Sequence, residues 1–254
     1  MSKILDFYHF MDEIAPFSKQ EPWDNSGFLV GDGEKEVKKV LVALDATLAV
    51  LEEAEKVGVE LIITHHPVIF RAMKEIHPDS IAFLAAQKGI GIISSHTCLD
   101  VAENGVSDCL AMALELSDIQ NGGDELGVLR VGKLKKPLSC EDFVAYVAEK
   151  LKVGGIKYIA AQKPIRTVAV CGGAGEDFFE DAIRVGADAY VTGNIKHSFW
   201  IEMKRKNFCV LDAGHFATEN PAMEPLAKRL AEHFSDTEIL LSKDSADPAE
   251  YWAK

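Results

Sequence analysis

The sequence predicts an α/β fold made of two internally duplicated halves, each with a mixed sheet. The first observation is a β-α-β pattern, in which apolar, β-branched runs at residues 40–45 and 59–63 flank a helical segment at 48–57. The second observation is the return of this pattern later in the chain, at residues 168–171, 176–185 and 187–191. We therefore expect parallel strands joined by helices in both halves.

A further pair of segments extends the duplication towards the start of each half. An expected helix at residues 6–13 has a counterpart at 142–149, and both begin with the dipeptide Asp-Phe. The pattern is interrupted over residues 118–139, where two consecutive glycines indicate a bridge between the halves. We predict one repeat over 1–120 and a second over 121–254, with the two together forming one compact unit.

Composition and charge restrict the class of protein and its partners. The chain has 254 residues and is 48% hydrophobic, which is typical of a soluble globular protein with a real core. Its 27 basic and 40 acidic side chains give a net charge of −13, which opposes general binding to nucleic acids. We expect small molecules or proteins as partners. The start of the chain lacks a signal-like segment and no apolar run would span a membrane, so we expect a cytoplasmic protein.

The cysteines do not indicate a disulfide framework or a thiolate zinc site. There are five of them, an odd number, and they are scattered with no Cys-x2-Cys pair. We expect them to be reduced and mostly buried.

Histidine and carboxylate residues recur at the ends of the predicted strands. His65 and His66 follow the run at 59–63, and two His-x3-acid segments follow the runs at 90–93 and 209–211. These segments are His96 to Asp100 and His215 to Glu219. Ligands of open α/β sheets gather beyond the carboxyl ends of the strands, so these groups predict a dinuclear metal site at the interface of the halves.

The residue types suit two divalent ions of zinc, iron, manganese or nickel. Adjacent strand residues point to opposite faces, but Pro67 interrupts the strand ladder, so His65 and His66 can turn towards different neighbouring ions. The alternative for this pair is one histidine in the core and one exposed. For a single His-x3-acid segment, the alternative is an exposed pair on a helix.

Three other segments have both a functional and a structural interpretation. The glycine-rich run at 172–175 can cradle a phosphate, but acidic residues follow it, which favours a tight turn. The loop 23–27, Trp-Asp-Asn-Ser-Gly, either lines a pocket or forms a turn anchored by its tryptophan. Lys196 and His197 either position an anion or move a proton, although a solvated start of a helix is slightly favoured.

Taken together, the motifs closely resemble those of the NIF-three-like family, whose members are often labelled GTP cyclohydrolase I type-two homologues. The resemblance covers nearly the whole chain and rests on residues 64–67, 95–100, 192–193 and 214–219, with support from 23–25 and 44–47. It implies a dinuclear metal site within a toroidal homohexamer built from dimers. The implied metal ligands are His65, His66, Asp100, His215 and Glu219.

The resemblance also implies roles for individual residues. Glu219 is expected to bridge the two ions, and His96 is expected to lie outside the ligand set. From the spacing alone, and not from the resemblance, we infer that His96 orients Asp100 or shuttles a proton. The chain departs from the family pattern at Phe216, Cys98 and Asn194, where a second His, an Asn and an acid are frequent. These departures leave the ligands in place and bear on contacts with the substrate.

Two functional hypotheses follow. The leading hypothesis is a metal-dependent hydrolase that acts on a small anionic molecule, nucleotide-like or phosphorylated, because two ions can activate a shared hydroxide and attract phosphate. The family label narrows this hypothesis to opening of the guanine ring of GTP. The alternative is a non-catalytic protein that delivers metal or serves as a regulatory scaffold for protein partners.

Overall fold

The chain folds into two units, each of which is built from two separate stretches of the sequence. The structure, a computed structural model, describes residues 1–250. Unit 1 comprises Met1–Glu103 and Met223–Ala246, whereas unit 2 comprises Asn104–Ala222 and a segment that starts at Asp247. These units are defined by contacts in space, whereas the repeats 1–120 and 121–254 were defined by similarity in sequence. The units therefore do not test the repeats, which stay a prediction.

Unit 1 contains a five-stranded mixed sheet in the order β1-β4-β3-β2-β11. Strands β2, β3, β4 and β11 run parallel, and only β1 is antiparallel to its neighbour. The strands are β1 (Gly27–Val30), β2 (Lys39–Ala43), β3 (Leu61–Thr64), β4 (Gly91–Ser94) and β11 (Glu238–Leu241). The helices are α1 (Ile4–Ile14), η1 (Phe17–Lys19), α2 (Leu48–Val57), α3 (Ile81–Gln87), α4 (Thr97–Val101) and α10 (Met223–His233).

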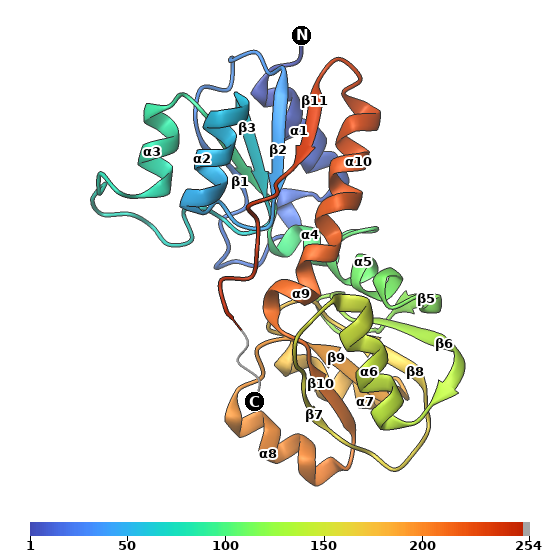
Figure 1. Cartoon of the computed structure of the whole chain (residues 1–254). Helices are drawn as coiled ribbons and strands as arrows, with labels where there is room; N and C mark the ends of the chain where they lie inside the picture. The colour runs from blue at the N-terminus through green and yellow to red at the C-terminus, as the bar shows by residue number, and fades with distance from the viewer. Residues whose placement is uncertain (251–254) are drawn as a thin grey trace. The chain divides into compact units, whose positions relative to one another are not determined.

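Helices cover both faces of this sheet. On one face, α2 and α3 bury Leu51 and Ala85 against strand residues such as Ile62. On the other face, α1 packs closely, and Phe7 stacks on Phe234 at 3.8 Å between ring centroids. Figure 1 shows α2 and α3 on one side of the strands and α1 on the other. Burial on both faces explains why the central strands are continuous apolar runs.

Unit 2 contains a six-stranded mixed sheet in the order β5-β6-β8-β9-β10-β7. Its central strands β8, β9 and β10 are parallel, and the outer pairings are antiparallel. The strands are β5 (Ser117–Asn121), β6 (Arg130–Leu138), β7 (Lys157–Ile159), β8 (Ile165–Val170), β9 (Ala189–Thr192) and β10 (Cys209–Asp212). The helices are α5 (Val106–Ala113), α6 (Cys140–Leu151), η2 (Glu176–Phe178), α7 (Phe179–Arg184), α8 (His197–Lys206), α9 (His215–Glu219) and η3 (Asn220–Ala222).

The core of unit 2 lies between this sheet and helices α5 and α6, where Leu110 and Phe143 pack with Val168. Local signals set the helix boundaries. Ser139 caps α6 by accepting a hydrogen bond from the amide of Asp142 at 3.1 Å. The helix expected at 176–185 is split, because a 3₁₀ turn from Glu176 to Phe178 precedes α7.

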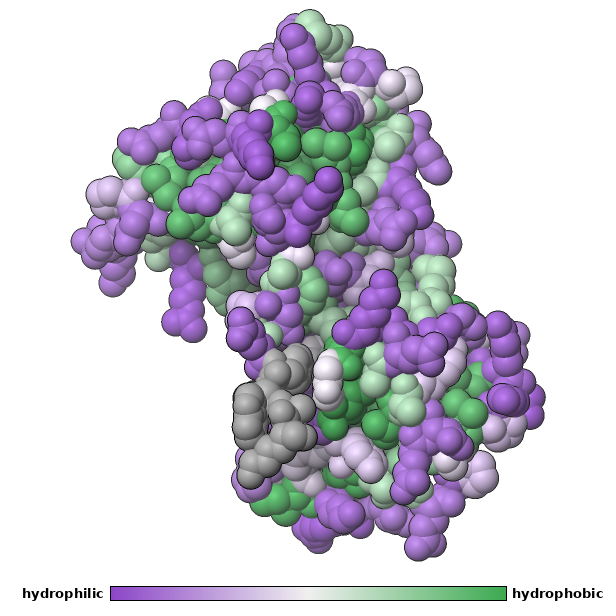
Figure 2. Space-filling view, viewed as in Figure 1, coloured by the Kyte–Doolittle hydropathy of each residue, from purple (hydrophilic) through white to green (hydrophobic). Residues whose placement is uncertain are grey.

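The predicted α/β class is confirmed, and both predicted β-α-β units form with parallel strands. All five cysteines are buried thiols, as expected. On the face drawn in Figure 2, hydrophilic side chains cover most of the surface, in keeping with the 26% of charged residues. Within residues 1–250, no helix is both long and apolar enough to cross a bilayer.

Candidate metal centre

The polar residues of unit 1 gather at one edge of its sheet. Strands β2, β3 and β4 are parallel, so the residues that follow them, Asp45, His65, His66 and His96, share this edge. Strand β1 is antiparallel and pairs Gly27 with Ser94, so the loop before β1 lies at the same edge. This is where an open α/β sheet is expected to bind ligands.

Three imidazoles of unit 1 form a tight group. One ring nitrogen from each of His65, His66 and His96 lies within 4.8 Å of the others. His65 is fully buried, and His66 and His96 are partly buried. The alternative for this pair, one histidine in the core and one exposed, therefore holds for His65 only, because the side chain of His66 is 22% exposed.

Each of these imidazoles is held through its Nδ1 atom. Nδ1 of His65 lies 2.9 Å from the carbonyl oxygen of Ser95. Nδ1 of His66 lies 2.7 Å from Oδ1 of Asp45, and Nδ1 of His96 lies 2.8 Å from Oδ1 of Asp24. Carbonyl and carboxylate oxygens accept hydrogen bonds, so Nδ1 donates in all three rings and the Nε2 lone pair is directed elsewhere.

This pattern is the one that metal-binding histidines show in proteins. A carboxylate or carbonyl partner fixes the tautomer and orientation of the ring and raises the basicity of the nitrogen that binds the metal. Nε2 of His65 also lies 3.5 Å from Oδ1 of Asp100, which adds a carboxylate to the donor group. The donor set of unit 1 therefore fits a divalent ion of the nitrogen- and oxygen-binding kind.

Asp24 connects the loop before β1 to the start of α4. Its Oδ2 accepts hydrogen bonds from the amide of Thr97 at 3.1 Å and from the Thr97 hydroxyl at 2.6 Å. Burial raises the pKa of Asp24, but hydrogen bonds from His96 and Thr97 outweigh it, and the pKa lies well below its usual value. Asp24 therefore remains a carboxylate that orients His96.

Unit 2 carries an imidazole and a buried carboxylate on the short helix α9. Nε2 of His215 lies 3.1 Å from Oε2 of Glu219, one helical turn later. Nδ2 of Asn194 lies 3.2 Å from Nδ1 of His215. Gly173 packs against the same pair, since a Cβ built there would lie 2.1 Å from Oε1 of Glu219. The carboxylate of Glu219 thus occupies space that only a glycine leaves open.

The structure brings predicted ligands together within each unit: His65, His66 and Asp100 in unit 1, and His215 and Glu219 in unit 2. Asp24 and Asp45, the partners of His96 and His66, were not predicted to hold these imidazoles, although Asp24 lies in the loop for which a pocket lining was one of two interpretations. Asp45 follows a strand at the same sheet edge as the histidines, and this position was a usable signal. Asp24 becomes recognisable only through the antiparallel pairing of β1.

The two His-x3-acid segments are not equivalent in position. Ser94 pairs with Thr64 in unit 1, and Asp212 pairs with Thr192 in unit 2. Counting from these strand ends, His96 corresponds to Gly214 rather than to His215. The assumption that the two segments are matching ends of the repeats is therefore wrong by one residue, which on a helix is a rotation of about 100°.

The glycine-rich run 172–175 and Lys196 make contacts that have structural explanations. In the run 172–175, the amide of Gly173 donates to Oγ1 of Thr218, and the amide of Gly175 donates to Oγ1 of Thr192, both at 3.0 Å. These bonds confirm the tight turn favoured over a phosphate cradle. Lys196 occupies the N-cap position of α8 without a capping hydrogen bond from its side chain, and it pairs with the buried carboxylate of Glu176. His197 is exposed, as the interpretation of a solvated helix start expects.

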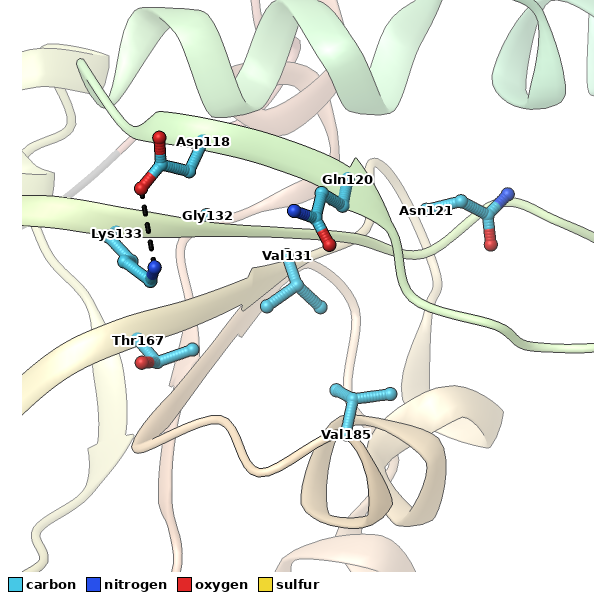
Figure 3. Close-up of a pocket in the computed structure, with 8 residues that line it drawn as sticks. All are labelled: Asp118, Gln120, Asn121, Val131, Gly132, Lys133, Thr167 and Val185. Atoms are coloured by element: carbon cyan, nitrogen blue, oxygen red, sulfur yellow. Dashed lines mark hydrogen bonds and ion pairs between the residues drawn. The ribbon is translucent and has the colours of Figure 1, made fainter.

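A separate pocket of about 300 Å³ lies in unit 2, over strands β5, β6 and β8. Figure 3 shows Val131 and Thr167 projecting into it, with Val185 approaching from the opposite wall. Nζ of Lys133 and Oδ2 of Asp118 form an ion pair of 3.3 Å at its rim. Its lining contains neither histidine nor cysteine, so this pocket is distinct from the metal donors.

Comparison with known proteins identifies the family. Residues 2–248 match the family model described as Duf34/NIF3 (NGG1p interacting factor 3). The chain belongs to the Duf34/NIF3 family. A Duf34/NIF3 relative from Clostridium perfringens, named GTP cyclohydrolase 1 type 2 homolog, is 33% identical and aligns over 98% of this chain and 99% of its own. A Nostoc relative of the same name is 37% identical over 77% of this chain and 78% of its own.

The fold of this Duf34/NIF3 chain is also similar to that of solved structures. A hypothetical protein of Staphylococcus aureus superimposes with a TM-score of 0.92 at 28% identity, covering 98% of this chain and 99% of the other. Reduced HcgD from Methanocaldococcus jannaschii superimposes with a TM-score of 0.82 at 27% identity, covering 95% and 98%.

Proposed function

We propose that this Duf34/NIF3 protein is a metal-dependent hydrolase with a dinuclear metal centre. The proposed ligands are His65, His66 and Asp100 of unit 1 and His215 and Glu219 of unit 2. The observation that carries the proposal is the group formed by His65, His66 and His96, in which one ring nitrogen of each lies within 4.8 Å of the others and each Nδ1 is held by a carbonyl or carboxylate oxygen.

Two bound divalent ions would supply a hydroxide that is nucleophilic at neutral pH and a clamp for a developing negative charge. The protein residues hold this chemistry in place. Asp45 and the carbonyl of Ser95 orient the imidazoles of His66 and His65. Glu219, buried beside His215, has two oxygens and is suited to bridging.

His96 differs from the proposed ligands in its partner. Burial raises the pKa of Asp24, but hydrogen bonds from His96 and Thr97 lower it by more, so Asp24 stays a carboxylate that can stabilise a protonated imidazole. Nε2 of His96 is therefore placed to accept a proton near the metal donors and return it to a leaving group. This assignment keeps His96 outside the ligand set.

The proposed substrate is a nucleotide-like or phosphorylated small molecule. Two divalent ions carry more positive charge than two carboxylates neutralise, so the centre would attract phosphate although the chain is acidic. The relatives named GTP cyclohydrolase 1 type 2 homolog make GTP the first substrate to test. We also propose the homohexameric assembly of dimers that the family resemblance implies.

Metal content per chain tests the centre. Elemental analysis is made on the native protein, His65→Ala, Glu219→Ala and the control His77→Ala, whose exposed imidazole contacts only Glu75 among the described hydrogen bonds. We expect about two ions per chain in the native protein and in the control, with a loss in both site variants. Metal content that neither His65→Ala nor Glu219→Ala changes would contradict the proposed ligands.

Activity is measured on the same samples. Formate release from GTP, and hydrolysis of a panel of phosphoesters and nucleotides, should depend on bound metal and fall in both site variants. A protein that keeps two ions but hydrolyses none of these compounds, and that transfers its metal to a competing chelator within minutes, would instead be a delivery protein. Native mass recorded alongside tests the hexamer.

A further inference from the structure

Two large aromatic side chains of unit 1 are exposed beside the metal donors. The side chain of Trp23 is 55% exposed and that of Phe70 is 48% exposed. Their ring centroids lie 5.8 Å apart and the ring planes are inclined by 46°, so the two rings are adjacent, angled parts of one aromatic surface. Exposed aromatic residues cost solvation free energy, and clusters of them mark places where a ligand or partner binds.

This surface borders His96. The centroid of Trp23 lies 5.7 Å and that of Phe70 lies 5.9 Å from the imidazole of His96, and both contacts are edge-on. His96 in turn belongs to the group of three imidazoles with His65 and His66. A molecule that covers the aromatic pair would therefore extend to the nitrogen donors.

Hydrogen bonds hold both aromatic residues in place through their neighbours in sequence. Nδ2 of Asn25 donates to the carbonyl oxygen of Ile69 at 2.6 Å, which ties the loop of Trp23 to the loop of Phe70. Asp24 ties the first loop to His96 and to Thr97. The pair is thus preorganised, unlike a mobile apolar patch, and a ligand need not pay for its ordering.

We propose that Trp23 and Phe70 form a stacking surface for a planar heteroaromatic ring of the substrate. The inference rests on the proposed function and adds the part of the substrate that lies next to the reacting group. A flat ring suits this surface because aromatic faces stack on aromatic faces with little regard to ring identity. Of the two interpretations of the loop 23–27, a pocket lining or a turn anchored by its tryptophan, the 55% exposure of Trp23 favours the pocket lining.

The same loop supplies matched controls. Residues 70–79 are all exposed, and Met73 and Ile76 are apolar members of this run. Neither is among the aromatic contacts of His96. If the run served instead as a contact between protein chains, removal of Met73 or Ile76 would matter as much as removal of Phe70.

The test compares a ligand that has a ring with one that lacks it. Isothermal titration calorimetry measures guanosine 5′-monophosphate and ribose 5-phosphate against the wild type, Trp23→Ala, Trp23→Phe, Phe70→Ala and Met73→Ala. We expect Trp23→Ala to weaken binding of the nucleotide about 5- to 150-fold and to leave ribose 5-phosphate unchanged. Trp23→Phe should restore most of the loss, Phe70→Ala should act in the same direction, and Met73→Ala should have no effect.

Several outcomes would overturn the inference. The inference fails if Trp23→Ala binds the nucleotide as tightly as the wild type does, or if it loses the same affinity for both probes. It also fails if the wild type binds the nucleotide no more tightly than ribose 5-phosphate. A change of native mass in Trp23→Ala or Phe70→Ala would indicate a contact between protein chains instead. Metal content of each sample separates the two proposals. Two ions per chain together with nucleotide binding that does not depend on Trp23 would contradict only the stacking surface. Nucleotide binding that depends on the ring in a protein without metal would contradict only the metal centre.

Discussion

Unit 1 and unit 2 arrange their central elements in the same order. In chain order, both have a helix, an antiparallel edge strand and three parallel strands joined by helices, and end in a five-residue helix. The strand order β1-β4-β3-β2 in unit 1 corresponds to β7-β10-β9-β8 in unit 2. This agreement supports the predicted duplication, which stays a prediction about the history of the chain.

The units differ in the side chains at the edge where the parallel strands end. Counting from the paired strand ends, His65 and His66 in unit 1 correspond to Gly193 and Asn194 in unit 2. Unit 1 thus offers imidazoles from the loop after its middle strand, whereas unit 2 offers backbone and an amide. In unit 2 the donors come from the short helix α9 instead.

The carboxylates differ in the same way. Asp45 follows β2 and corresponds by strand register to Gly173, which follows β8. In unit 2 the absence of a side chain at Gly173 leaves room for Glu219. The parallel strands thus provide a fixed edge in both units, and the corresponding loop residue after the first parallel strand is either an acid, Asp45, or a glycine, Gly173, that leaves room for an acid from α9.

Gly173 gives the largest expected effect. In Gly173→Ala, the new methyl group would overlap Oε1 of Glu219, whose carboxylate can swing away. We therefore expect metal binding to weaken about 100-fold, as in Glu219→Ala. Destabilisation in urea unfolding should be only about 1 kcal/mol, from the backbone φ of +63°.

Gly186→Ala is the matched control for this prediction. Gly186 also has a positive φ, of +77°, but no atom lies within 4 Å of its built Cβ. It should show the same loss of about 1 kcal/mol without any loss of metal. Equal metal content in the two variants would contradict the role given to Gly173.

An exchange of carboxylate and amide partners gives the next largest effect. Asp45→Asn keeps an acceptor for Nδ1 of His66 but removes its charge, so we expect metal binding about 10-fold weaker. Asn194→Asp makes the converse change beside His215 and should strengthen binding by a similar factor. Competition with a chromogenic chelator measures both.

Asp79→Asn serves as the control for charge, because Asp79 is exposed. If all three variants bind metal with the wild-type affinity, the difference in partners between the units has no chemical consequence.

Much of this framework was predictable because strands and helices have local signals. The β-branched runs, the glycine at the end of α2 and the return of the β-α-β pattern all lie within short stretches of sequence. The rule that ligands collect beyond strand ends then placed His65, His66 and His215 at the correct edges. Strand β11 was missed, since its pairing with β2 joins residues about 200 positions apart.

The details of the site were less predictable because they depend on register and on tertiary hydrogen bonds. A spacing of His-x3-acid contains no information on where the preceding strand ends, and this explains the one-residue error between His96 and His215. Asp24 belongs to the site only because β1 runs antiparallel to β4, and its sequence neighbours Trp23 and Asn25 do not reveal that direction.

Asp24 and Asp188 offer a comparison of the units through pH. Hydrogen bonds lower the pKa of both carboxylates despite the opposing effect of burial, with His96 and Thr97 as donors to Asp24 and Lys163 and Thr167 as donors to Asp188. A depressed folded-state pKa stabilises the protein above the unfolded value of about 3.9 and ceases to do so as the pH falls through the folded value.

We expect Asp24→Asn to cost about 1–2 kcal/mol at pH 7 and Asp188→Asn about 1 kcal/mol, by urea unfolding. Both costs should be constant down to about pH 5 and shrink below about pH 4. A cost that grows on acidification would have the wrong sign and would refute the assignment.

Lys196 gives the smallest expected effect and decides between its two interpretations. Its side chain is 75% exposed, so the ion pair with Glu176 contributes little and Lys196→Ala should cost at most about 0.5 kcal/mol. Glu176→Ala should lower the free energy of unfolding by about 1–3 kcal/mol, because the buried carboxylate also accepts a hydrogen bond of 2.9 Å from the backbone amide of Lys196. Binding of ribose 5-phosphate should be unchanged in Lys196→Ala, since Glu176 already neutralises this cation. A tenfold loss of phosphate binding in this variant would instead make Lys196 an anion-positioning residue and give unit 2 a charged contact that unit 1 lacks.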